Sequence, residues 1–446
     1  MKLPSNYADR QICMIGLGYV GLTLAVAMAE VGFRVYGVEK DKTIVDCINK
    51  GQAHFTEAGL DLRLAAQVAA GRLTASVDWP AKGACNIFVI TVGTPLNSER
   101  LTNLDAISAV AAQVAKVMEG GALVVLRSTV RLGVTREVVK PLLDAAAIPY
   151  DLAFCPERTL EGKALMELRT LPQIVGGWDE ESAMRASQMF NFITPTTIRV
   201  KDLETAEMIK LVNNTQRDLM FAFANEVAGM CDAVGVSVVD VISAGNMGYS
   251  RASMPIPGPV GGPCLEKDPY ILSEGVRLRG GKTRLTLMGR QLNEELPALA
   301  VKKVAEVFSG AAVRKIAVAG LAFKGRPETS DLRGSLVTPL IAALRAAFPD
   351  AAIVGFDPAV NETDTLGLGI AYAETAEIAF QTADVVLFQN NNTRFAALDM
   401  KGLSQLMNAP GIIYDFWNQF DLETLSLATG IAYFGLGTQV LLGQSS

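Results

Sequence analysis

A glycine-rich turn near the N-terminus constrains the fold of this chain more than any other feature. Gly16, Gly18 and Gly21 form the pattern G-x-G-x-x-G, which follows an apolar strand and opens a helix. The first glycine allows a tight turn, the second lets the backbone approach a pyrophosphate, and the third lets helix and strand pack closely. The pattern therefore predicts the first strand, turn and helix of a dinucleotide-binding α/β sheet.

The second predicted strand ends in an acid. Glu39 follows the strand 34–38 and lies 23 residues after Gly16, where a carboxylate can bond a ribose 2′-hydroxyl. This acid favours NAD over NADP because it repels a 2′-phosphate, although Lys40 and Lys42 weaken that preference. FAD or S-adenosylmethionine is the alternative ligand for such a unit.

Strand and helix patterns alternate along the first part of the chain. The candidate strands are 11–15, 34–38, 86–92, 122–126 and 150–154, and helices such as 22–31 and 104–118 lie between them. All but the last of these strands are mainly apolar, which is typical of parallel strands buried on both faces. We therefore expect an NAD-binding domain over residues 1–200.

The pattern changes to long helices and then returns to strands. Residues 203–245 carry apolar side chains at helical spacing, and another helix is expected to start near Pro297 and run to Phe308. Strand patterns resume at Lys315, Ile353 and Ala383. The sequence predicts an α/β fold with two doubly wound Rossmann-like domains, the second over 311–446, joined by a central helical region over 201–310.

Composition argues against several classes of protein. Charged residues make up 19% of the 446 residues and the net charge is −6 without a basic tract, so nucleic acid is not an expected partner. The six cysteines are scattered without a C-x-x-C pair, which predicts reduced thiols in a cytoplasmic protein and no metal site. The apolar run 12–29 imitates a membrane segment, but its glycines favour a strand-to-helix turn, so no membrane partner is expected.

Cys264 is the candidate nucleophile. It lies in the segment GPVGGPCLEKDPY, whose glycines and prolines argue against the alternative that it is a small buried hydrophobe. Lys267 can lower the pKa of the thiol, and Asp268 can act as a general base toward water. A thiolate next to a nicotinamide site can hold an aldehyde as a hemithioacetal and release an acid, so we expect a dehydrogenase that oxidises past the aldehyde. The single histidine, His54, lies far from this segment.

Other polar residues are also candidates for a site. Lys210, Asn214 and Arg217 share one helix face, which is either a solvated stripe or, for the lysine and the amide, an oxyanion site. Further polar clusters follow predicted strands, at 91–95, 128–129, 155–158, 323–324 and 331–333. Strand C-termini in doubly wound sheets face the ligand crevice, and turn or cap roles are the alternative.

The ordered set of motifs resembles the UDP-glucose/GDP-mannose dehydrogenase family. GLGYVGL, VGTPL, STV, CPER, KLVNN, FANE, GGPCLEKDP, GLAFKG and DLR occur in the family's order over nearly the whole chain. The resemblance implies a cytoplasmic enzyme with NAD as cofactor that oxidises the C6 hydroxyl of a UDP-sugar to a uronic acid in a four-electron reaction. It also implies a homodimer or higher homo-oligomer.

Several segments indicate which sugar to expect. PER, PGPVGGPC, DPY and LNEELP look closer to UDP-N-acetylmannosamine and UDP-N-acetylglucosamine 6-dehydrogenases, and UDP-N-acetylmannosamine is favoured. Glu161, the longer segment 325–330 and Trp417 depart from the family's patterns. Four alternatives stay open: a UDP-glucose 6-dehydrogenase, a two-electron β-hydroxyacid dehydrogenase, an NAD-binding scaffold without catalysis and a membrane-anchored protein with residues 12–29 inserted.

The resemblance also implies a role for each site residue. Cys264 would form a thiohemiacetal and then a thioester, while Lys210 and Asn214 would stabilise oxyanions. Asp268 and Thr129 would position or activate water, and Glu157 would be an acid/base or water partner. The implied cofactor contacts are Gly16, Gly18, Tyr19, Val20, Gly21, Glu39, Thr94, Thr129, Lys267 and Arg333. The implied substrate contacts are Glu157, Arg158, Lys210, Asn214, Gly261, Phe323, Lys324 and, from a neighbouring subunit, Arg251.

Overall fold

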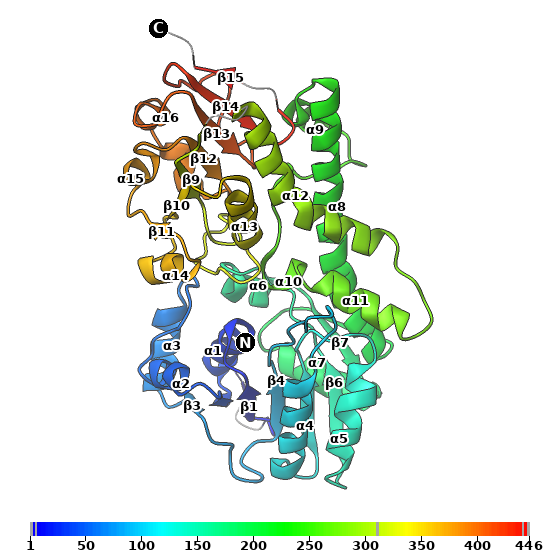
Figure 1. Ribbon diagram of the computed structural model, residues 1–446. Coiled ribbons are helices and arrows are strands. Elements are labelled where there is room, and N and C mark those ends of the chain that lie inside the picture. The colour runs from blue at the N-terminus through cyan, green and yellow to red at the C-terminus, as the bar shows by residue number, and fades with distance from the viewer. Residues whose placement is uncertain (1–2, 5–6, 309–311, 439–440, 444–446) are drawn as a thin grey trace. The chain divides into compact units, whose positions relative to one another are not determined.

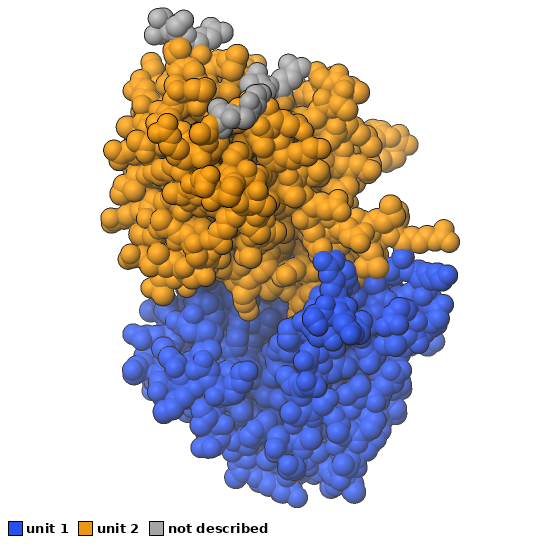
Figure 2. Space-filling view, viewed as in Figure 1, with its two compact units in different colours: residues 1–213, 270–283 blue, residues 214–269, 284–446 orange. Residues whose placement is uncertain are grey.

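Two sheets organise the chain, and each belongs to its own unit. The computed structural model describes residues 3–4, 7–308, 312–438 and 441–443 (Figure 1). Unit 1 comprises residues 1–213 and 270–283, and unit 2 comprises residues 214–269 and 284–446 (Figure 2). Two helices, α8 (Leu203–Val234) and α11 (Asp268–Arg277), begin in one unit and end in the other.

Unit 1 is built on an eight-stranded sheet within the described residues, in the order β3-β2-β1-β4-β5-β6-β7-β8. Its strands are β1 (Gln11–Ile15), β2 (Arg34–Val38), β3 (Leu73–Ser76), β4 (Ile87–Ile90), β5 (Ala122–Leu126), β6 (Tyr150–Phe154), β7 (Gln173–Gly177) and β8 (Thr197–Val200). Every neighbouring pair is parallel except β6 and β7. The strand order reverses between β1 and β4, which is where such sheets bind ligands.

Helices cover both faces of this sheet. They are α1 (Tyr19–Val31), α2 (Lys42–Asn49), α3 (Leu60–Ala69), α4 (Asp105–Val117), a π-helical turn η1 (Thr135–Val139), α5 (Lys140–Asp144), α6 (Ala164–Thr170) and α7 (Glu180–Phe190). Alternate residues of β1 enter different cores, Ile12 and Met14 on one face and Cys13 and Ile15 on the other. Burial on both faces explains why this strand is apolar throughout.

Unit 2 repeats the doubly wound plan with seven strands among the residues described, in the order β11-β10-β9-β12-β13-β14-β15. The strands are β9 (Lys315–Ala319), β10 (Ala352–Phe356), β11 (Ala371–Tyr372), β12 (Val385–Phe388), β13 (Gly411–Asp415), β14 (Ile431–Gly435) and β15 (Leu441–Leu442). Only the pair β14 and β15 is antiparallel in this part of the chain. The shorter helices are α13 (Val337–Ala347), α14 (Glu362–Gly367), α15 (Ala376–Phe380), a 3-10 turn η2 (Thr393–Ala397) and α16 (Met400–Ser404).

Two long helices pack on one face of the second sheet. Figure 1 shows α8 beside α12 (Leu285–Phe308), and the smaller helices α9 (Val238–Asn246) and α10 (Gly262–Leu265) lie between them in the sequence. Ala224 of α8 and Ala300 of α12 belong to the same buried core as Ile316 of β9. Small side chains at these positions let the helices approach the sheet closely.

Most of the predicted elements are confirmed, and one helix start was wrong. The strands 11–15, 34–38, 122–126 and 150–154 match β1, β2, β5 and β6, and the long helices over 203–245 match α8 and α9. Pro297 does not start a helix, because it lies buried inside α12, which begins at Leu285. A proline inside a helix removes one hydrogen bond, and here the burial of neighbours such as Leu296 and Ala300 offsets that loss.

The apolar run 12–29 folds as β1 and most of α1 in the interior of unit 1. In the part of the chain that the structure describes, no helix combines the length and the hydropathy needed to cross a membrane. The cytoplasmic location stays a prediction.

A buried carboxylate fixes the start of α8 within unit 1. Glu207 is 1% exposed and accepts hydrogen bonds from the Gly133 N–H (2.5 Å), the Thr135 N–H (3.0 Å) and the Thr135 hydroxyl (2.6 Å). Burial raises the pKa of Glu207 to about 7, against the lowering effect of these donors. The contact joins the segment after Thr129 to the helix turn that carries Lys210.

We expect this carboxyl to make the stability of unit 1 depend on pH. Because the pKa is raised from 4.5 to about 7 on folding, its stabilising contribution is complete below pH 4.5 and is lost as the pH rises through 7. The shift corresponds to on the order of 3 kcal/mol. Glutamine does not titrate, so the unfolding midpoint of Glu207→Gln should vary less than that of the parent between about pH 5 and 8.

Tryptophan fluorescence measures the unfolding midpoint of unit 1 in a Trp417→Phe background. The other two of the three tryptophans, Trp79 and Trp178, both lie in that unit. Parallel pH curves for the parent and for Glu207→Gln would contradict the expectation.

Candidate active site

The glycine turn of unit 1 has the shape that a pyrophosphate needs. Gly16 has a φ of +88°, and a Cβ at Gly21 would collide with the carbonyl oxygen of Gly16. A Cβ at Gly18 would meet nothing within 4 Å, so the space over the first turn of α1 is open. That first turn holds no acidic residue and has no side-chain cap, which suits an anion at its N–H groups.

The acid after β2 completes this turn. Glu39 is half-buried, and its Oε2 accepts a hydrogen bond from the Leu17 N–H at 2.8 Å. The Thr91 hydroxyl donates to the carbonyls of Ile15 (2.9 Å) and Gly16 (2.7 Å), which holds the turn against the end of β4. The residues therefore fit NAD, with the pyrophosphate at Gly18 and the adenosine ribose at Glu39.

Tyr19 connects the glycine turn to two other loops. Its hydroxyl donates to Glu57 and accepts a hydrogen bond from the Gly162 N–H at 2.9 Å. Glu57 is 6% exposed and also accepts from the Gly162 N–H at 2.7 Å. Val20, the next residue, is half-buried in the first turn of α1. Sequence reasoning assigned no role to Glu57, because a glutamate in a polar stretch carries no pattern that sets it apart.

Three of the polar clusters that follow predicted strands, at 91–95, 128–129 and 155–158, come together at one edge of the first sheet. They follow β4, β5 and β6, which are adjacent strands. The Thr94 hydroxyl, in a residue only 1% exposed, donates to the carbonyl of Thr129 at 2.5 Å. This bond ties the segment after β4 to the segment after β5 and leaves the Thr129 side chain half-buried.

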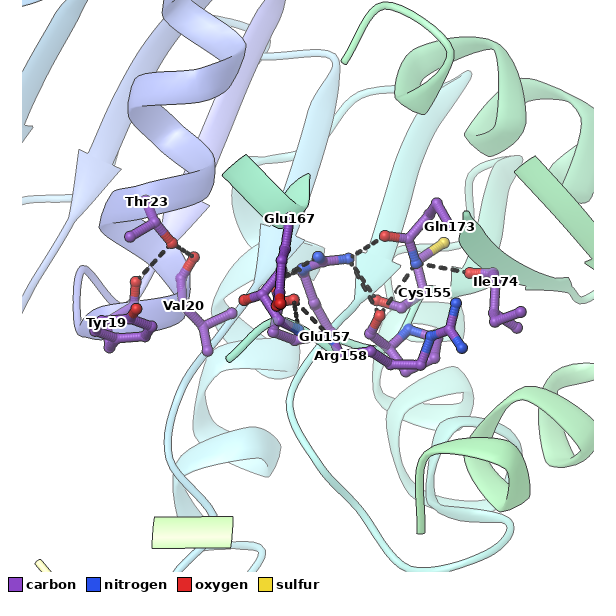
Figure 3. A network of polar contacts seen from close by, with 12 residues as sticks. Tyr19, Val20, Thr23, Cys155, Glu157, Arg158, Glu167, Gln173 and Ile174 are labelled. Carbon is purple, nitrogen blue, oxygen red and sulfur yellow. Dashed lines mark hydrogen bonds and ion pairs between the residues drawn. The ribbon is translucent and has the colours of Figure 1, made fainter. Parts of the chain in front are cut away.

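Glu157 is held by four hydrogen bonds in a buried network (Figure 3). Its Oε2 accepts from Arg127 Nη2 (2.6 Å) and Nε (3.2 Å), and its Oε1 accepts from the N–H groups of Arg158 (2.7 Å) and Thr159 (2.8 Å). Burial alone would raise the pKa of Glu157, but the charge of Arg127, these donors and the charge of Lys210 lower it. An ionised carboxylate favours the base or water-partner role over the acid role.

Arg127 and Gln173 were missed by the sequence analysis. Arg127 is 2% exposed and also donates to the Gln173 side chain at 2.9 Å and to the carbonyl of Cys155 at 3.0 Å. The available signal was a charged residue directly after the apolar strand 122–126, where sheet edges carry functional groups. Arg158 directs its guanidinium to the carbonyl of Pro172, and burial lowers its pKa.

The three polar residues of α8 have different surroundings. Lys210 is 7% exposed, Asn214 is half-buried and Arg217 is exposed. Of these three residues, only Arg217 therefore fits the alternative that the helix face is exposed to solvent. The unit boundary falls within this helix, with Lys210 in unit 1 and Asn214 in unit 2.

Cys264 is the exposed cysteine of the chain. All six cysteines lie among the described residues, and the other five are buried or half-buried. The expected loop contains the four-residue helix α10, with Pro263 in its first turn and Cys264 next. The exposure contradicts the alternative that Cys264 is a buried hydrophobe.

Asp268 begins α11 and is fully buried. Its Oδ2 accepts a hydrogen bond from Asn214 Nδ2 at 2.6 Å, so unit 2 brings together two of the predicted catalytic residues. Lys267, which precedes it, is half-buried and donates its backbone N–H to the carbonyl of Cys264 at 3.2 Å.

The turn before Cys264 packs against the segment after β9. A Cβ at Gly262, whose φ is +84°, would collide with the ring of Phe323, and the Gly262 N–H donates to the carbonyl of Gly334 at 2.8 Å. A Cβ at Gly261 would collide with that same carbonyl. Unit 2 thus places Phe323 next to the turn before Cys264, and this turn contains Gly261. Both Gly261 and Phe323 are predicted substrate residues.

The other predicted cations of unit 2 lie nearer to solvent. Lys324 places its Nζ 5.1 Å from the ring centroid of Phe323. The Arg333 side chain is 67% exposed and pairs with Asp331. Arg251 follows α9 in an exposed segment, where its guanidinium lies 4.7 Å from the ring centroid of Tyr249.

The second sheet uses the acid after its second strand differently from the first. Asp357 follows β10, is 5% exposed, and accepts hydrogen bonds from the N–H groups of Leu321 (2.7 Å) and Ala322 (3.1 Å) and from Asn390 (3.1 Å). Burial raises its pKa. Because these donors enclose it, Asp357 is less open to a ribose than Glu39.

Comparison with known proteins agrees with this arrangement. The chain matches the NAD-binding domain of the UDP-glucose/GDP-mannose dehydrogenase family over residues 10–194, the central domain over 204–295 and the UDP-binding domain over 317–422. It is 30% identical to a UDP-N-acetyl-D-mannosamine dehydrogenase from Pyrococcus horikoshii over 412 residues, which are 90% of this chain and 94% of the relative.

Two solved structures share the fold. A UDP-D-ManNAc dehydrogenase from Pyrococcus horikoshii has a TM-score of 0.86 at 30% identity, covering 96% of this chain and 99% of that one. A UDP-glucose dehydrogenase from Pyrobaculum islandicum has a TM-score of 0.86 at 25% identity, covering 98% and 100%. The chain therefore belongs to the UDP-glucose/GDP-mannose dehydrogenase family and is an NAD-dependent nucleotide-sugar dehydrogenase.

Proposed function

We propose that the protein oxidises the C6 hydroxyl of a UDP-N-acetylhexosamine, with UDP-N-acetylmannosamine favoured, to the uronic acid in a four-electron reaction. The observation that carries the proposal is the exposed thiol of Cys264 in α10, which lies shortly before Asp268, the residue that accepts a hydrogen bond from Asn214. A two-electron dehydrogenase needs neither this thiol nor a second nucleotide domain.

The reaction balances in four steps. The C6 alcohol loses a hydride and a proton and becomes an aldehyde. The Cys264 sulfur adds to the aldehyde carbon and forms a thiohemiacetal, which loses a second hydride and proton to give a thioester. Water then cleaves the C–S bond, which yields the acid and the free thiol. NAD accepts one hydride in each oxidation, so two NAD molecules are reduced for each sugar.

Five side chains assist these steps by stabilising charge or by acting on water. Lys210 and Asn214 stabilise the oxygen whose charge develops at each step, and the loss of one such donor typically costs about 10²–10³ in rate. Thr129, Asp268 and Glu157 position or activate the water that cleaves the thioester. The lowered pKa of Glu157 keeps its carboxylate ionised, which suits an acceptor that orients this water by a hydrogen bond.

Two further groups of residues bind the cofactor and the nucleotide sugar. The glycine turn and Glu39 bind NAD, and we propose that Tyr19, Val20, Thr94, Lys267 and Arg333 contribute to the same site. Phe323, Lys324, Gly261 and Arg158 bind the UDP-sugar. The support for this assignment is the contact of Gly262 with Phe323, which brings the cysteine segment and the UDP-binding domain together within unit 2.

The sugar is tested by comparing substrates. We expect UDP-N-acetylmannosamine to give the highest kcat/KM for NADH formation among UDP-N-acetylmannosamine, UDP-N-acetylglucosamine, UDP-glucose and GDP-mannose. The relative named above and the PER and DPY segments support this choice. UDP-glucose is the second candidate, supported by the TM-score of 0.86 with a UDP-glucose dehydrogenase. A clear preference for UDP-glucose would replace the N-acetylhexosamine in the proposal.

We expect Cys264→Ser to separate the two oxidations. A serine hydroxyl is a weak nucleophile at neutral pH, so the variant should form about one NADH per sugar instead of two and should release an aldehyde. NADH absorbance at limiting sugar, with semicarbazide to trap the aldehyde, gives the count. Cys155→Ser is the matched control, since Cys155 is fully buried. Two NADH per sugar at the parent rate in Cys264→Ser would refute the covalent role.

A homodimer is also proposed, and an exposed apolar stripe supports it. Met220, Phe223, Met230 and Val234 lie on one face of α8 in unit 2 and are 39%, 52%, 53% and 72% exposed. Exposed apolar patches of this kind mark sites of association. A second copy of the chain offers a matching stripe across a two-fold axis. We propose that Arg251 then completes the sugar site of the neighbouring subunit.

Mixed dimers test the role of Arg251. We expect the homodimers of Arg251→Ala and of Cys264→Ser to be inactive in acid formation. A mixed dimer, co-expressed with two different affinity tags, should regain about half of the parent activity, because one of its two sites then holds both residues. Mixed dimers without activity would place Arg251 in the site of its own subunit, and an active Arg251→Ala homodimer would place it outside the site.

A further inference from the structure

Four buried polar side chains join α8 to α12 in unit 2, and we call them the α8–α12 polar network. Asp218, Asn225, Arg290 and Asn293 are 0%, 4%, 1% and 0% exposed. Arg290 donates to Asp218 Oδ1 at 2.7 Å, Asn293 donates to the same oxygen at 3.0 Å, and Asn225 donates to Asn293 at 2.9 Å. Burial raises the pKa of Asp218 to about 6, although the charge of Arg290 opposes this.

Both terminal nitrogens of Arg290 also donate to the segment that carries Cys264. Arg290 Nη2 donates to the carbonyl of Val260 at 3.0 Å, and Nη1 donates to the carbonyl of Leu265 at 3.1 Å. In the sequence, these two carbonyls lie on either side of Gly261, Gly262, Pro263 and Cys264. One planar guanidinium, oriented by Asp218, thus holds both ends of the turn that presents the thiol.

Asn225 holds the beginning of the same segment. Its Nδ2 donates to the carbonyl of Gly258 at 3.2 Å, and its Oδ1 accepts from the Gly258 N–H at 2.8 Å. Trp417 packs against Gly258, where a Cβ would lie 2.6 Å from the indole ring. The segment 258–265 is therefore bound to the network at three backbone positions, Gly258, Val260 and Leu265.

Stability alone does not account for this arrangement. A buried ion pair is often no more stabilising than apolar side chains of the same size, because the desolvation of both charges offsets their attraction. The cysteine segment, residues 258–265, in contrast needs contacts from other parts of the chain to hold its conformation. It is rich in glycine, which costs conformational entropy, and a four-residue helix such as α10 does not form by itself.

We propose that Arg290 is a positioning residue that sets the place of the Cys264 thiol, and that Asp218, Asn225 and Asn293 orient it. The inference rests on the proposed role of Cys264 as nucleophile. Since the first oxidation does not need the thiol, a displaced cysteine segment slows the second oxidation more than the first.

Arg290→Lys tests the proposal. Lysine keeps the positive charge next to Asp218, but a single ammonium cannot bind two carbonyls in the fixed geometry of a guanidinium. We expect fewer than two NADH per UDP-N-acetylmannosamine, with trapped aldehyde. We also expect kcat for acid formation to fall on the order of 10²-fold, the cost of misplacing a reacting group by about 1 Å.

Hydrogen exchange gives a readout that needs no substrate. The peptide covering residues 258–267 should exchange on the order of 10-fold faster in Arg290→Lys, while peptides from the sheets of both units keep their rates. Lys303→Met is the matched control. Lys303 pairs with Asp232 at 2.9 Å between the same two helices and reaches no carbonyl of the cysteine segment in any hydrogen bond found among the described residues.

The outcomes separate this inference from the proposed function. Unchanged exchange over 258–267, or faster exchange with two NADH per sugar at the parent kcat, overturns the role of Arg290 and leaves Cys264 as nucleophile. Full activity of Cys264→Ser overturns the proposed function, and the positioning role falls with it. Equal loss of both oxidations would show a general structural role and would also overturn the inference.

Asn225→Asp repeats the test if Arg290→Lys fails to fold. The change keeps the size of the side chain and the acceptor for the Gly258 N–H, but it places a carboxylate against the carbonyl of Gly258. The same faster exchange and the same loss of the second NADH are expected. Parent behaviour in both readouts counts against the proposal.

Discussion

Burial of parallel strands on both faces is the constraint on which the rest of the structure depends. Because β1, β4, β5 and β9 face apolar cores on both sides, polar side chains are confined to the strand ends and the segments after them. These segments have irregular backbone, whose N–H and C=O groups need partners when they are buried. In both units the partners are buried charged side chains.

The charged side chains that hold backbone also decide which groups remain for chemistry. Glu207 holds the segment after Thr129, Arg127 holds Glu157, and Arg290 holds the segment around Cys264. Each is nearly inaccessible to solvent or to a ligand. Two residues next to the held backbone groups, Thr129 and Cys264, are more open. The polar side chains thus form two sets. The buried set orients backbone segments, and the more exposed set is available to react.

The sequence predicted much of the fold and only part of the site. Strand and helix periods identified the central strands, and the glycine turn with Glu39 identified the NAD-binding unit, because these signals are local. It did not reveal Arg127, Glu57, Asp218 or Arg290. Their partners lie 30, 38, 72 and 72 residues away in the chain, and no local pattern records such a distance. The prediction of a helix start at Pro297 was wrong for the opposite reason. Proline locally favours the start of a helix, but packing places Pro297 inside α12.

By itself the sequence determined the class of fold and the family, and it predicted Cys264 as the nucleophile, because apolar periodicity and ordered motifs are properties of the chain. Only the tertiary structure decided that Arg127 and two backbone N–H groups hold Glu157, that Asn214 bonds Asp268, and that Cys264 is exposed while the other cysteines are not. These properties depend on burial and on partners from distant segments, and both exist only once the chain has folded.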